Sequence, residues 1–395
     1  MSVVEAVAHR LAIRIFRGWR DGQLRLTLPD GSIQTFGDPA GTPHDLLVLD
    51  NRFFTRLLSS GVTGVGESYM ADEWKTDDLP GLIAAALANS NSVRIDGPLS
   101  RLSATIDSYR QRRRANTPAG SRDNIHDHHD LGNDFFRLFL DETLTYSCAI
   151  YTDKNQSQAD AQINKYSVIC HKLGLGPDDH VLGIGCGWGG FAIHAAATAG
   201  CRVTGITISD EQLNLARERV AAAGLNHLVD IQHLDYRDVT DTYDAAVSIE
   251  MFEAVGRDYW DGFFQAAARA LRPGGQFLLQ TIATPNSNRD HPFRGSGWVS
   301  KYIFPGGILP AMVEIQESLE HVLPTLHFAA EQEIGLRYVR TLDTWRRRFW
   351  DKIDTVRALR YDERFIRMWN YYLASCSAAF KVKHLRDVQL LLTRA

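Results

Sequence analysis

The chain has few cysteines, no long apolar run and no strong excess of either charge. Its five cysteines among 395 residues form no tight pairs and no metal-ligand spacing. This pattern favours a reducing cytoplasm over a disulfide framework and predicts no metal site. No stretch approaches the roughly 18 apolar residues of a membrane span. Arg10, Arg14 and Arg17 interrupt the first apolar residues, so no secretory signal is expected.

The net charge excludes one further class of partner. A formal charge of −4 gives the whole chain no attraction to nucleic acid, so no nucleic-acid partner is expected. The distribution of charge is more informative than its sum. Arginines gather at two places, on one face of the first predicted helix and in a later polar segment, which contains Arg110, Arg112, Arg113 and Arg114. Such clusters attract anionic lipid headgroups, although a solvated face and a charged linker are the plainer interpretation.

Glycines follow a short apolar run near the middle of the chain. The segment Val181-Leu-Gly-Ile-Gly-Cys-Gly-Trp-Gly-Gly190 leads directly into a helix-forming run. A buried strand, a glycine loop and a helix N-terminus in this order form a nucleotide-binding turn. The segment satisfies G-x-G-x-x-G, which is weak evidence by itself. The next predicted strand, Cys201 to Ile208, ends without the acidic residue of a dinucleotide site, and the nearest polar groups for a ribose are Asp210 and Gln212.

The elements after the glycine turn favour S-adenosylmethionine (SAM) over a dinucleotide. A buried strand is expected at Tyr243–Ile249, and a Pro-Gly-Gly turn precedes another strand at Gln276–Ile282. This order resembles the class I SAM-dependent methyltransferase fold, which implies an α/β domain with a Rossmann-like, doubly wound, seven-stranded sheet. A dehydrogenase is the weaker alternative.

The chain divides into three predicted parts. The first begins with a helix, contains a hairpin around Pro29-Asp30-Gly31 and closes with a helical stretch from Leu79 to Ala88. The parts are a small α+β N-terminal domain (1–95) with a lipid-binding or accessory role, an Arg-rich linker (96–123) and a methyltransferase domain (124–395).

Several motifs in the last part together resemble the cyclopropane fatty acid synthase family, which includes the mycolic acid cyclopropane synthases. The motifs, besides the glycine turn, are His128-His-Asp-Leu-Gly-Asn-Asp-Phe-Phe136, Leu140-Asp-Glu-Thr-Leu-Thr-Tyr-Ser-Cys-Ala149, Ser248-Ile-Glu-Met-Phe-Glu-Ala-Val-Gly256, Lys301-Tyr-Ile-Phe-Pro-Gly-Gly307 and Arg337-Tyr-Val-Arg-Thr-Leu342. A looser likeness of Gly66-Glu-Ser-Tyr-Met-Ala-Asp-Glu-Trp74 links the N-terminal part to the phospholipid-acting members.

The resemblance implies a chemistry and a set of residues. A cis double bond attacks the SAM methyl group, positive charge develops on the acyl chain, and a proton must leave. In this family a bound bicarbonate is the base, and the resemblance implies that Cys148, Glu253 and Tyr338 hold it, with backbone help near Ile282 and with Gln280 in the remaining ligand position. Glu253 is expected to orient the bicarbonate rather than to take the substrate proton. The residues implied for SAM are Tyr146, Ser147, Gly185, Gly187, Gly189, Thr207, Gln212 (ribose), Asp235 and Tyr236 (adenine).

Three positions depart from the family pattern. Gly183 stands where an acidic residue usually orders the SAM loop, which predicts weaker SAM binding. Gln280 stands where better-known members have histidine, and glutamine cannot titrate. This leaves open whether the product is a ring or a methylene- or methyl-branched chain. His129 replaces the usual tyrosine.

We therefore predict a SAM-dependent C-methyltransferase that acts on unsaturated acyl chains of phospholipids at an anionic membrane surface. It would be cytoplasmic, peripherally membrane-associated and able to form a homodimer. The acyl chain is expected in an apolar tunnel lined partly by Phe135, Phe136, Phe252 and Phe304. Two alternatives stay open, a SAM methyltransferase with a soluble acceptor and a catalytically silent SAM- or lipid-binding relative.

Overall fold

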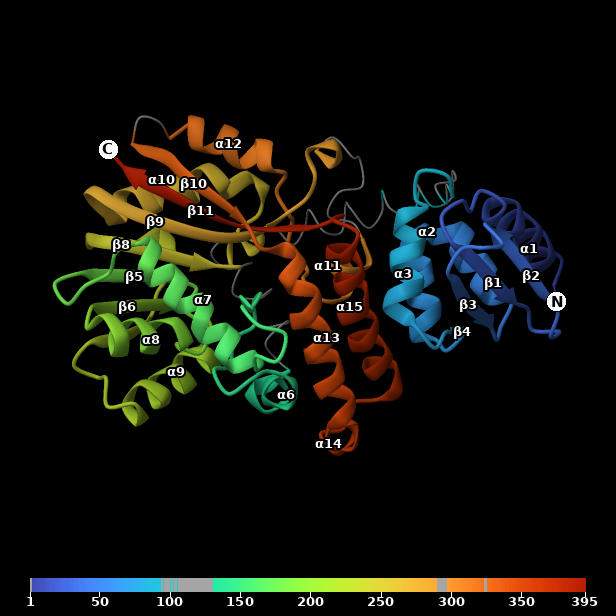
Figure 1. Cartoon of the computed structure of the whole chain (residues 1–395), viewed down its shortest axis with the longest axis horizontal. Helices are drawn as coiled ribbons and strands as arrows, with labels where there is room; N and C mark the ends of the chain where they lie inside the picture. The colour runs from blue at the N-terminus through green and yellow to red at the C-terminus, as the bar shows by residue number, and fades with distance from the viewer. Residues whose placement is uncertain are drawn as a thin grey trace. The chain divides into compact units, whose positions relative to one another are not determined.

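A computed structural model describes residues 2–93, 131–289, 297–322 and 325–395, with a few single positions between 94 and 130. The chain folds into two compact units (Figure 1). The first takes in residues 1–113, 292–305 and 350–384, and the second takes in residues 114–291, 306–349 and 385–395. Most of the predicted linker, 96–123, and His129 lie outside the described residues.

The first unit contains a four-stranded sheet in the order β2-β1-β3-β4. The predicted hairpin is confirmed, because β1 (Gln23–Thr27) pairs antiparallel with β2 (Ile33–Gly37). β3 (Pro43–Val48) runs parallel to β1, and β4 (Trp74–Lys75) pairs antiparallel with β3. The helices of this unit are α1 (Val3–Phe16), α2 (Arg52–Met70), α3 (Leu79–Ala88), α11 (Trp298–Tyr302), α14 (Ile353–Ala358) and α15 (Glu363–Lys381).

Two segments from late in the chain pack within this first unit, although the sequence analysis counts them with residues 124–395. α15 lies against α2 and α3. Tyr371 of α15 contacts Tyr69 of α2 with 5.5 Å between ring centroids, and Trp298 of α11 packs edge-on against Tyr371. Aromatic burial therefore joins these late helices to the N-terminal residues.

The second unit is built on a seven-stranded sheet in the order β10-β11-β9-β8-β5-β6-β7. β5 to β9 run parallel to their neighbours, whereas β11 is antiparallel to both β9 and β10. The strands are β5 (His180–Ile184), β6 (Arg202–Thr207), β7 (Val229–His233), β8 (Tyr243–Ile249), β9 (Leu271–Ala283), β10 (Leu326–Glu333) and β11 (Arg386–Arg394).

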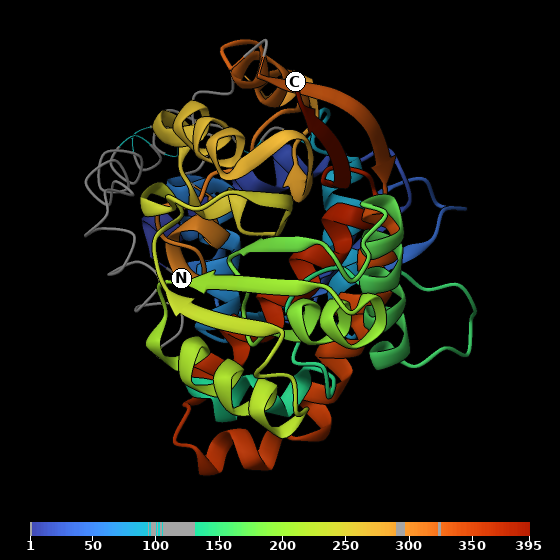
Figure 2. The ribbon, with the colours of Figure 1, turned by 90° about the vertical axis from the view of Figure 1, so that its left-hand side faces the viewer.

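Helices cover both faces of this sheet, and Figure 2 shows its green and yellow strands side by side with helices around them. The α-helices of the unit are α6 (Gly132–Phe139), α7 (Gln158–Lys172), α8 (Gly190–Ala199), α9 (Asp210–Ala222), α10 (Trp260–Ala270), α12 (Met312–Glu320) and α13 (Gly335–Asp351). Successive residues of β5 point to opposite faces: Val181 packs with α7, α8 and α9, whereas Leu182 packs with α10 and α12. The predicted doubly wound α/β fold is confirmed.

Candidate active site

The glycine turn joins β5 to α8 as the sequence predicts. Gly185, Gly187 and Gly189 all have positive φ, at 73°, 54° and 79°. A side chain on Gly185 would also collide with Met251, whose Cγ would lie 2.7 Å from the added Cβ. The turn therefore requires glycine for both its conformation and its close packing, and it leaves backbone N–H groups at the N-terminus of α8 to face a ligand.

Other residues predicted for SAM lie at the carboxyl ends of β6 and β7. Thr207 ends β6, and its hydroxyl donates to Gln212 Oε1 at 2.9 Å, so this amide is already oriented. Tyr236 follows β7 and packs on Phe263, with 5.2 Å between ring centroids. Asp235 is held by Arg237, whose Nε and Nη2 donate at 2.8 and 2.6 Å. Together with the glycine turn, these groups lie beside the switch in strand order at β5, and they are the residues that would hold SAM there.

Tyr146 and Ser147 lie in the loop before α7. Tyr146 packs against Phe136 and Trp345, at 5.4 and 5.2 Å between ring centroids. Ser147 Oγ accepts a hydrogen bond from Lys165 Nζ at 2.5 Å. The loop is therefore fixed by aromatic packing on one side and by a buried cation on the other.

Three of the catalytic residues predicted from the resemblance, Cys148, Gln280 and Tyr338, donate hydrogen bonds to a glutamate that was not predicted as a site residue. Glu250 Oε1 accepts hydrogen bonds from the Cys148 backbone N–H at 2.8 Å and from Gln280 Nε2 at 2.7 Å. Its other oxygen, Oε2, accepts from the Tyr338 hydroxyl at 2.6 Å. Glu250 follows β8 directly with a φ of 50°, a region that residues other than glycine rarely occupy.

Glu253, the predicted carboxylate, occupies the neighbouring position. Its Oε1 accepts hydrogen bonds from the Ile282 N–H and from Thr281 Oγ1, whereas its buried Oε2 has no hydrogen-bond partner among the described residues. Burial and the nearby Glu250 charge raise the pKa of Glu253 from 4.5 to about 7. A carboxyl group with this pKa changes its charge near neutral pH, as a general acid or base requires.

A second layer of buried polar groups supports the first. Gln280 Nε2 also lies 3.3 Å from Asp387 Oδ2, and Gln280 Oε1 accepts from Gln389 Nε2 at 2.9 Å. β11 brings both residues there, because its antiparallel pairing places Gln389 opposite Gln280. Burial and the Glu250 charge raise the pKa of Asp387, and burial lowers the pKa of Lys165. The side chains of Asp387 and Lys165 are completely buried.

Cys148 contributes its backbone rather than its thiol. The side chain is fully buried, and its Sγ lies 3.8 Å from the Ile334 carbonyl oxygen. Burial together with the Asp387 and Glu250 charges raises the pKa of this thiol well above its usual value, so the thiol stays protonated and packs as a small apolar group.

The contacts of Glu250 decide whether bicarbonate fits here. The resemblance places Cys148, Gln280 and Tyr338 at the bicarbonate site. In the structure the Cys148 N–H, the Gln280 amide and the Tyr338 hydroxyl already donate to Glu250. A second anion in the same place would lack these donors and would face the Glu250 charge, which is unfavourable. The residues as they lie do not fit bicarbonate.

Two further expectations concern apolar residues and metals. Phe252 is fully buried against Trp260 and Phe264 in the core under the sheet. Phe135 and Phe136 are also buried, and Phe304 belongs to the first unit.

Among the described residues, no group of three or more His, Cys, Asp or Glu side chains is placed to hold a metal ion.

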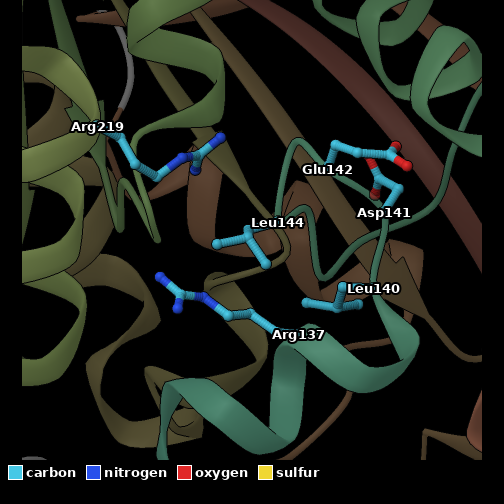
Figure 3. A pocket seen from close by; sticks show the side chains of 6 residues that line it. All are labelled: Arg137, Leu140, Asp141, Glu142, Leu144 and Arg219. Carbon is cyan, nitrogen blue, oxygen red and sulfur yellow. The ribbon is translucent and has the colours of Figure 1, made fainter. Parts of the chain in front are cut away.

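An open depression of about 370 Å³ lies elsewhere in the second unit, after the end of α6. Figure 3 shows Arg137 and Arg219 on either side of Leu144, with Asp141 and Glu142 beyond it. No predicted catalytic or SAM residue lines it. Arg219 donates to the Trp188 carbonyl oxygen of the glycine turn, so the depression lies next to that turn.

Four residues of this network, Glu250, Asp387, Gln389 and Lys165, were not predicted from the sequence. The position of Glu250 could have identified it as a site residue, because it directly follows a predicted strand, and side chains at the carboxyl ends of such strands often line a site. Gln389 and Asp387 gave a weaker indication, as polar residues in the otherwise apolar segment Asp387-Val-Gln-Leu-Leu-Leu392. Lys165 lies within an amphipathic helix and gave none.

Comparisons with known proteins identify the family of the chain. The family described as mycolic acid cyclopropane synthetase matches residues 117–390. The chain is 38% identical over 379 residues to the tuberculostearic acid methyltransferase UfaA1 of Mycobacterium tuberculosis, covering 94% of this chain and 88% of that protein. It is also 38% identical over 357 residues to the cyclopropane-fatty-acyl-phospholipid synthase of Escherichia coli, covering 88% and 86%.

Solved structures of the same family superpose on this chain. The cyclopropane synthase MmaA2 from Mycobacterium tuberculosis superposes with a TM-score of 0.64 at 30% identity, covering 69% of this chain and 98% of that one. The mycolic acid cyclopropane synthase CmaA1, solved in complex with SAH and CTAB, gives a TM-score of 0.64 at 31% identity, covering 69% and 98%. The chain belongs to the mycolic acid cyclopropane synthetase family and is a SAM-dependent methyltransferase.

Proposed function

We propose that this protein transfers a one-carbon unit from SAM to the cis double bond of unsaturated acyl chains in phospholipids, forming a cyclopropane ring. The observation that carries the proposal is the carboxylate network of the half-buried Glu250 and Glu253 at the carboxyl ends of β8 and β9, in the same sheet as the glycine turn. The substrate class is supported by the name of the Escherichia coli relative. Bicarbonate has no part in this proposal.

The residues of the network have separate tasks in this reaction. Bound SAM supplies a methyl group on a positively charged sulfur. The carboxylates stabilise the positive charge that develops on the acyl chain and receive the proton that the product must lose. Tyr338 and Gln280 hold Glu250 in place through two hydrogen bonds, and the deeply buried surroundings exclude water from a reactive cation.

The first experiment incubates the protein with methyl-labelled SAM and vesicles that contain cis-monounsaturated acyl chains, followed by mass spectrometry and proton NMR of the lipids. We expect acyl chains that gain one labelled CH₂ and show upfield ring protons. Olefinic methylene protons at the same mass would make the product a methylene branch, one of the alternatives that Gln280 leaves open. Unlabelled lipid, with SAM binding shown separately, would contradict the proposal and favour a soluble acceptor or a silent relative.

We further propose that the first unit holds the protein on an anionic membrane surface through α1, as a cytoplasmic, peripherally associated protein. None of the helices within the described residues is long and apolar enough to cross a bilayer. One face of α1 exposes Val3, Val7 and Leu11, which are 82%, 52% and 46% accessible, and continues with Arg14. An apolar stripe that continues into basic residues suits insertion at the boundary between headgroups and acyl chains. A homodimer stays a prediction.

The double variant Val7→Asp/Leu11→Asp should weaken binding to anionic vesicles about tenfold or more, because it removes two apolar contacts and adds two negative charges. Vesicle co-sedimentation measures the effect. Val62→Asp is the matched control, since Val62 is 62% exposed but lies on α2. Equal binding by the wild type and the double variant would show that α1 does not contact the membrane.

Gly183→Asp should tighten SAM binding about tenfold, the effect of one hydrogen bond to a charged group. The position accepts a side chain, because an added Cβ would meet nothing closer than 3.7 Å. Isothermal titration calorimetry of the variant against Gly183→Ala separates the carboxylate from the methyl group. Equal affinities of the two variants would remove the sequence-based expectation that the glycine weakens SAM binding.

A further inference from the structure

The Glu250 carboxylate is held in the way that a small bound anion is held. Its donors come from three places in the chain: the loop before α7 gives the Cys148 N–H, β9 gives the Gln280 amide, and α13 gives the Tyr338 hydroxyl. Their hydrogen bonds to the carboxylate measure 2.6 to 2.8 Å. Donors that converge from separate elements on two oxygens form a preorganised anion site.

The backbone of Glu250 is shaped to deliver this carboxylate. Its N–H donates to the Gln280 carbonyl oxygen at 2.8 Å, so β9 holds the residue in register just beyond β8. Its φ of 50° is unfavourable for a side chain of this size and persists only where the surroundings determine it. Glycine adopts this conformation freely, so removal of the side chain leaves the backbone path intact.

The charges around the site disfavour a second anion. Burial and the Glu250 charge raise the pKa of both Glu253 and Asp387, and the buried Lys165 is the cation that opposes Glu250 and Asp387. With a pKa of about 7, Glu253 is partly protonated near neutral pH. A free anion added to this cluster would increase the repulsion, whereas Glu250 already supplies a carboxylate at the donors.

We infer that the Glu250 carboxylate takes the place of an exogenous bicarbonate in this protein and accepts the proton released on ring closure, so that the enzyme works without bicarbonate. This inference rests on the proposed function. In the balanced step, the π pair of the double bond forms a bond to the transferred methyl carbon, and the S–CH₃ pair stays on sulfur. The new methyl group then loses H⁺ to a Glu250 oxygen, and its C–H pair closes the ring onto the cationic carbon.

The test compares the wild type with Glu250→Gly in buffer freed of carbon dioxide, with and without added bicarbonate. We expect wild-type turnover to be unchanged by bicarbonate. Glu250→Gly should lose about 10² to 10⁴ in turnover, the usual contribution of a general base, and added bicarbonate should restore a large part by entering the emptied anion site. Glu250→Gln, which fills the site with an uncharged amide, should be equally slow and should not respond to bicarbonate.

A second readout needs no lipid and separates this inference from the proposed function. Thermal unfolding with increasing bicarbonate should leave the wild type and Glu250→Gln unchanged and should raise the Tm of Glu250→Gly, since a ligand stabilises the state that binds it. Sodium chloride at equal ionic strength is the control. Bicarbonate-dependent wild-type turnover, or a wild-type Tm that rises with bicarbonate, would overturn the inference. Inactivity towards every lipid with the expected Tm pattern would overturn only the proposed function.

Discussion

Glu253→Gln should lower turnover by about 10² or more while leaving SAM affinity nearly unchanged. The amide keeps the size and the hydrogen-bond acceptor for Ile282 N–H and Thr281, but it cannot carry charge or take a proton. The Glu253 pKa is about 7. Because the ionised form supplies the negative charge, wild-type turnover should rise as the pH passes about 7, and the variant should lack this rise. Steady-state kinetics at about eight pH values between about 5.5 and 9 gives the pH dependence of turnover for the wild type and for the variant.

The same substitution should increase stability at alkaline pH. The pKa of Glu253 is higher in the folded protein, about 7, than its ordinary 4.5. A raised carboxyl pKa contributes stability that is complete below about pH 4.5 and is lost as the pH rises through about 7. The difference corresponds to about 3 kcal/mol above pH 7. Glutamine does not ionise, so the variant avoids this loss.

Chemical denaturation at pH 5 and pH 8.5 measures the effect on the free energy of unfolding. Glu211→Gln, at an exposed carboxyl group of α9, is the control and should behave like the wild type at both pH values. Wild-type turnover in Glu253→Gln would show that this carboxylate is not required. If wild type and Glu253→Gln differ in stability by the same amount at pH 5 and at pH 8.5, the pKa of Glu253 is not raised in the folded protein.

The sequence was sufficient for the glycine turn and for the methyltransferase sheet, because both depend on local patterns. The apolar run of β5, the glycines with positive φ and the helix that follows are contiguous, so their spacing alone specifies a strand, turn and helix. The same holds for the hairpin of β1 and β2, whose turn is marked by Pro29-Asp30-Gly31. In these segments the interactions that decide the structure lie close together along the chain.

The composition of the carboxylate network could not be obtained in this way. Gln280 faces Gln389 across the antiparallel pair β9–β11, 109 positions along the chain, and Lys165 comes from α7. The partner of each group depends on strand register and on helix packing, which a single sequence does not reveal. The place of the late helices α11 and α15 in the first unit was not predicted for the same reason, because their aromatic contacts join residues that are distant in sequence.

The structure also changes the interpretation of Gln280. In the sequence, Gln280 is a departure from the family pattern that leaves the product open. In the structure its amide group donates towards Glu250 and Asp387 through Nε2 and accepts from Gln389 through Oε1. A neutral amide performs both functions without titrating. We therefore interpret Gln280 as the companion of Glu250, a group that holds an internal carboxylate, and the bicarbonate experiments on Glu250 variants test this interpretation as well.

Lys165→Met should lower the free energy of unfolding by about 3 to 5 kcal/mol at pH 8, the usual cost of leaving buried charges without their partner. Lys165 is fully buried, donates to Ser147 Oγ, and opposes the negative charge of Glu250 and Asp387. Methionine keeps most of the apolar stem, so the loss of the charge dominates over the loss of packing.

The loss of unfolding free energy in Lys165→Met should depend on pH, and the direction of this dependence shows whether charge or packing causes the loss. As the pH falls to 5, Glu253 and Asp387, whose pKa values are raised, become protonated, and less negative charge remains for the lysine to oppose. The deficit of Lys165→Met should therefore shrink at pH 5. Lys154→Met, at an exposed position, should cost less than about 0.5 kcal/mol at either pH. A deficit that is equal at pH 5 and pH 8 would assign the effect to packing instead of charge, and would remove Lys165 as the counterion of the carboxylates.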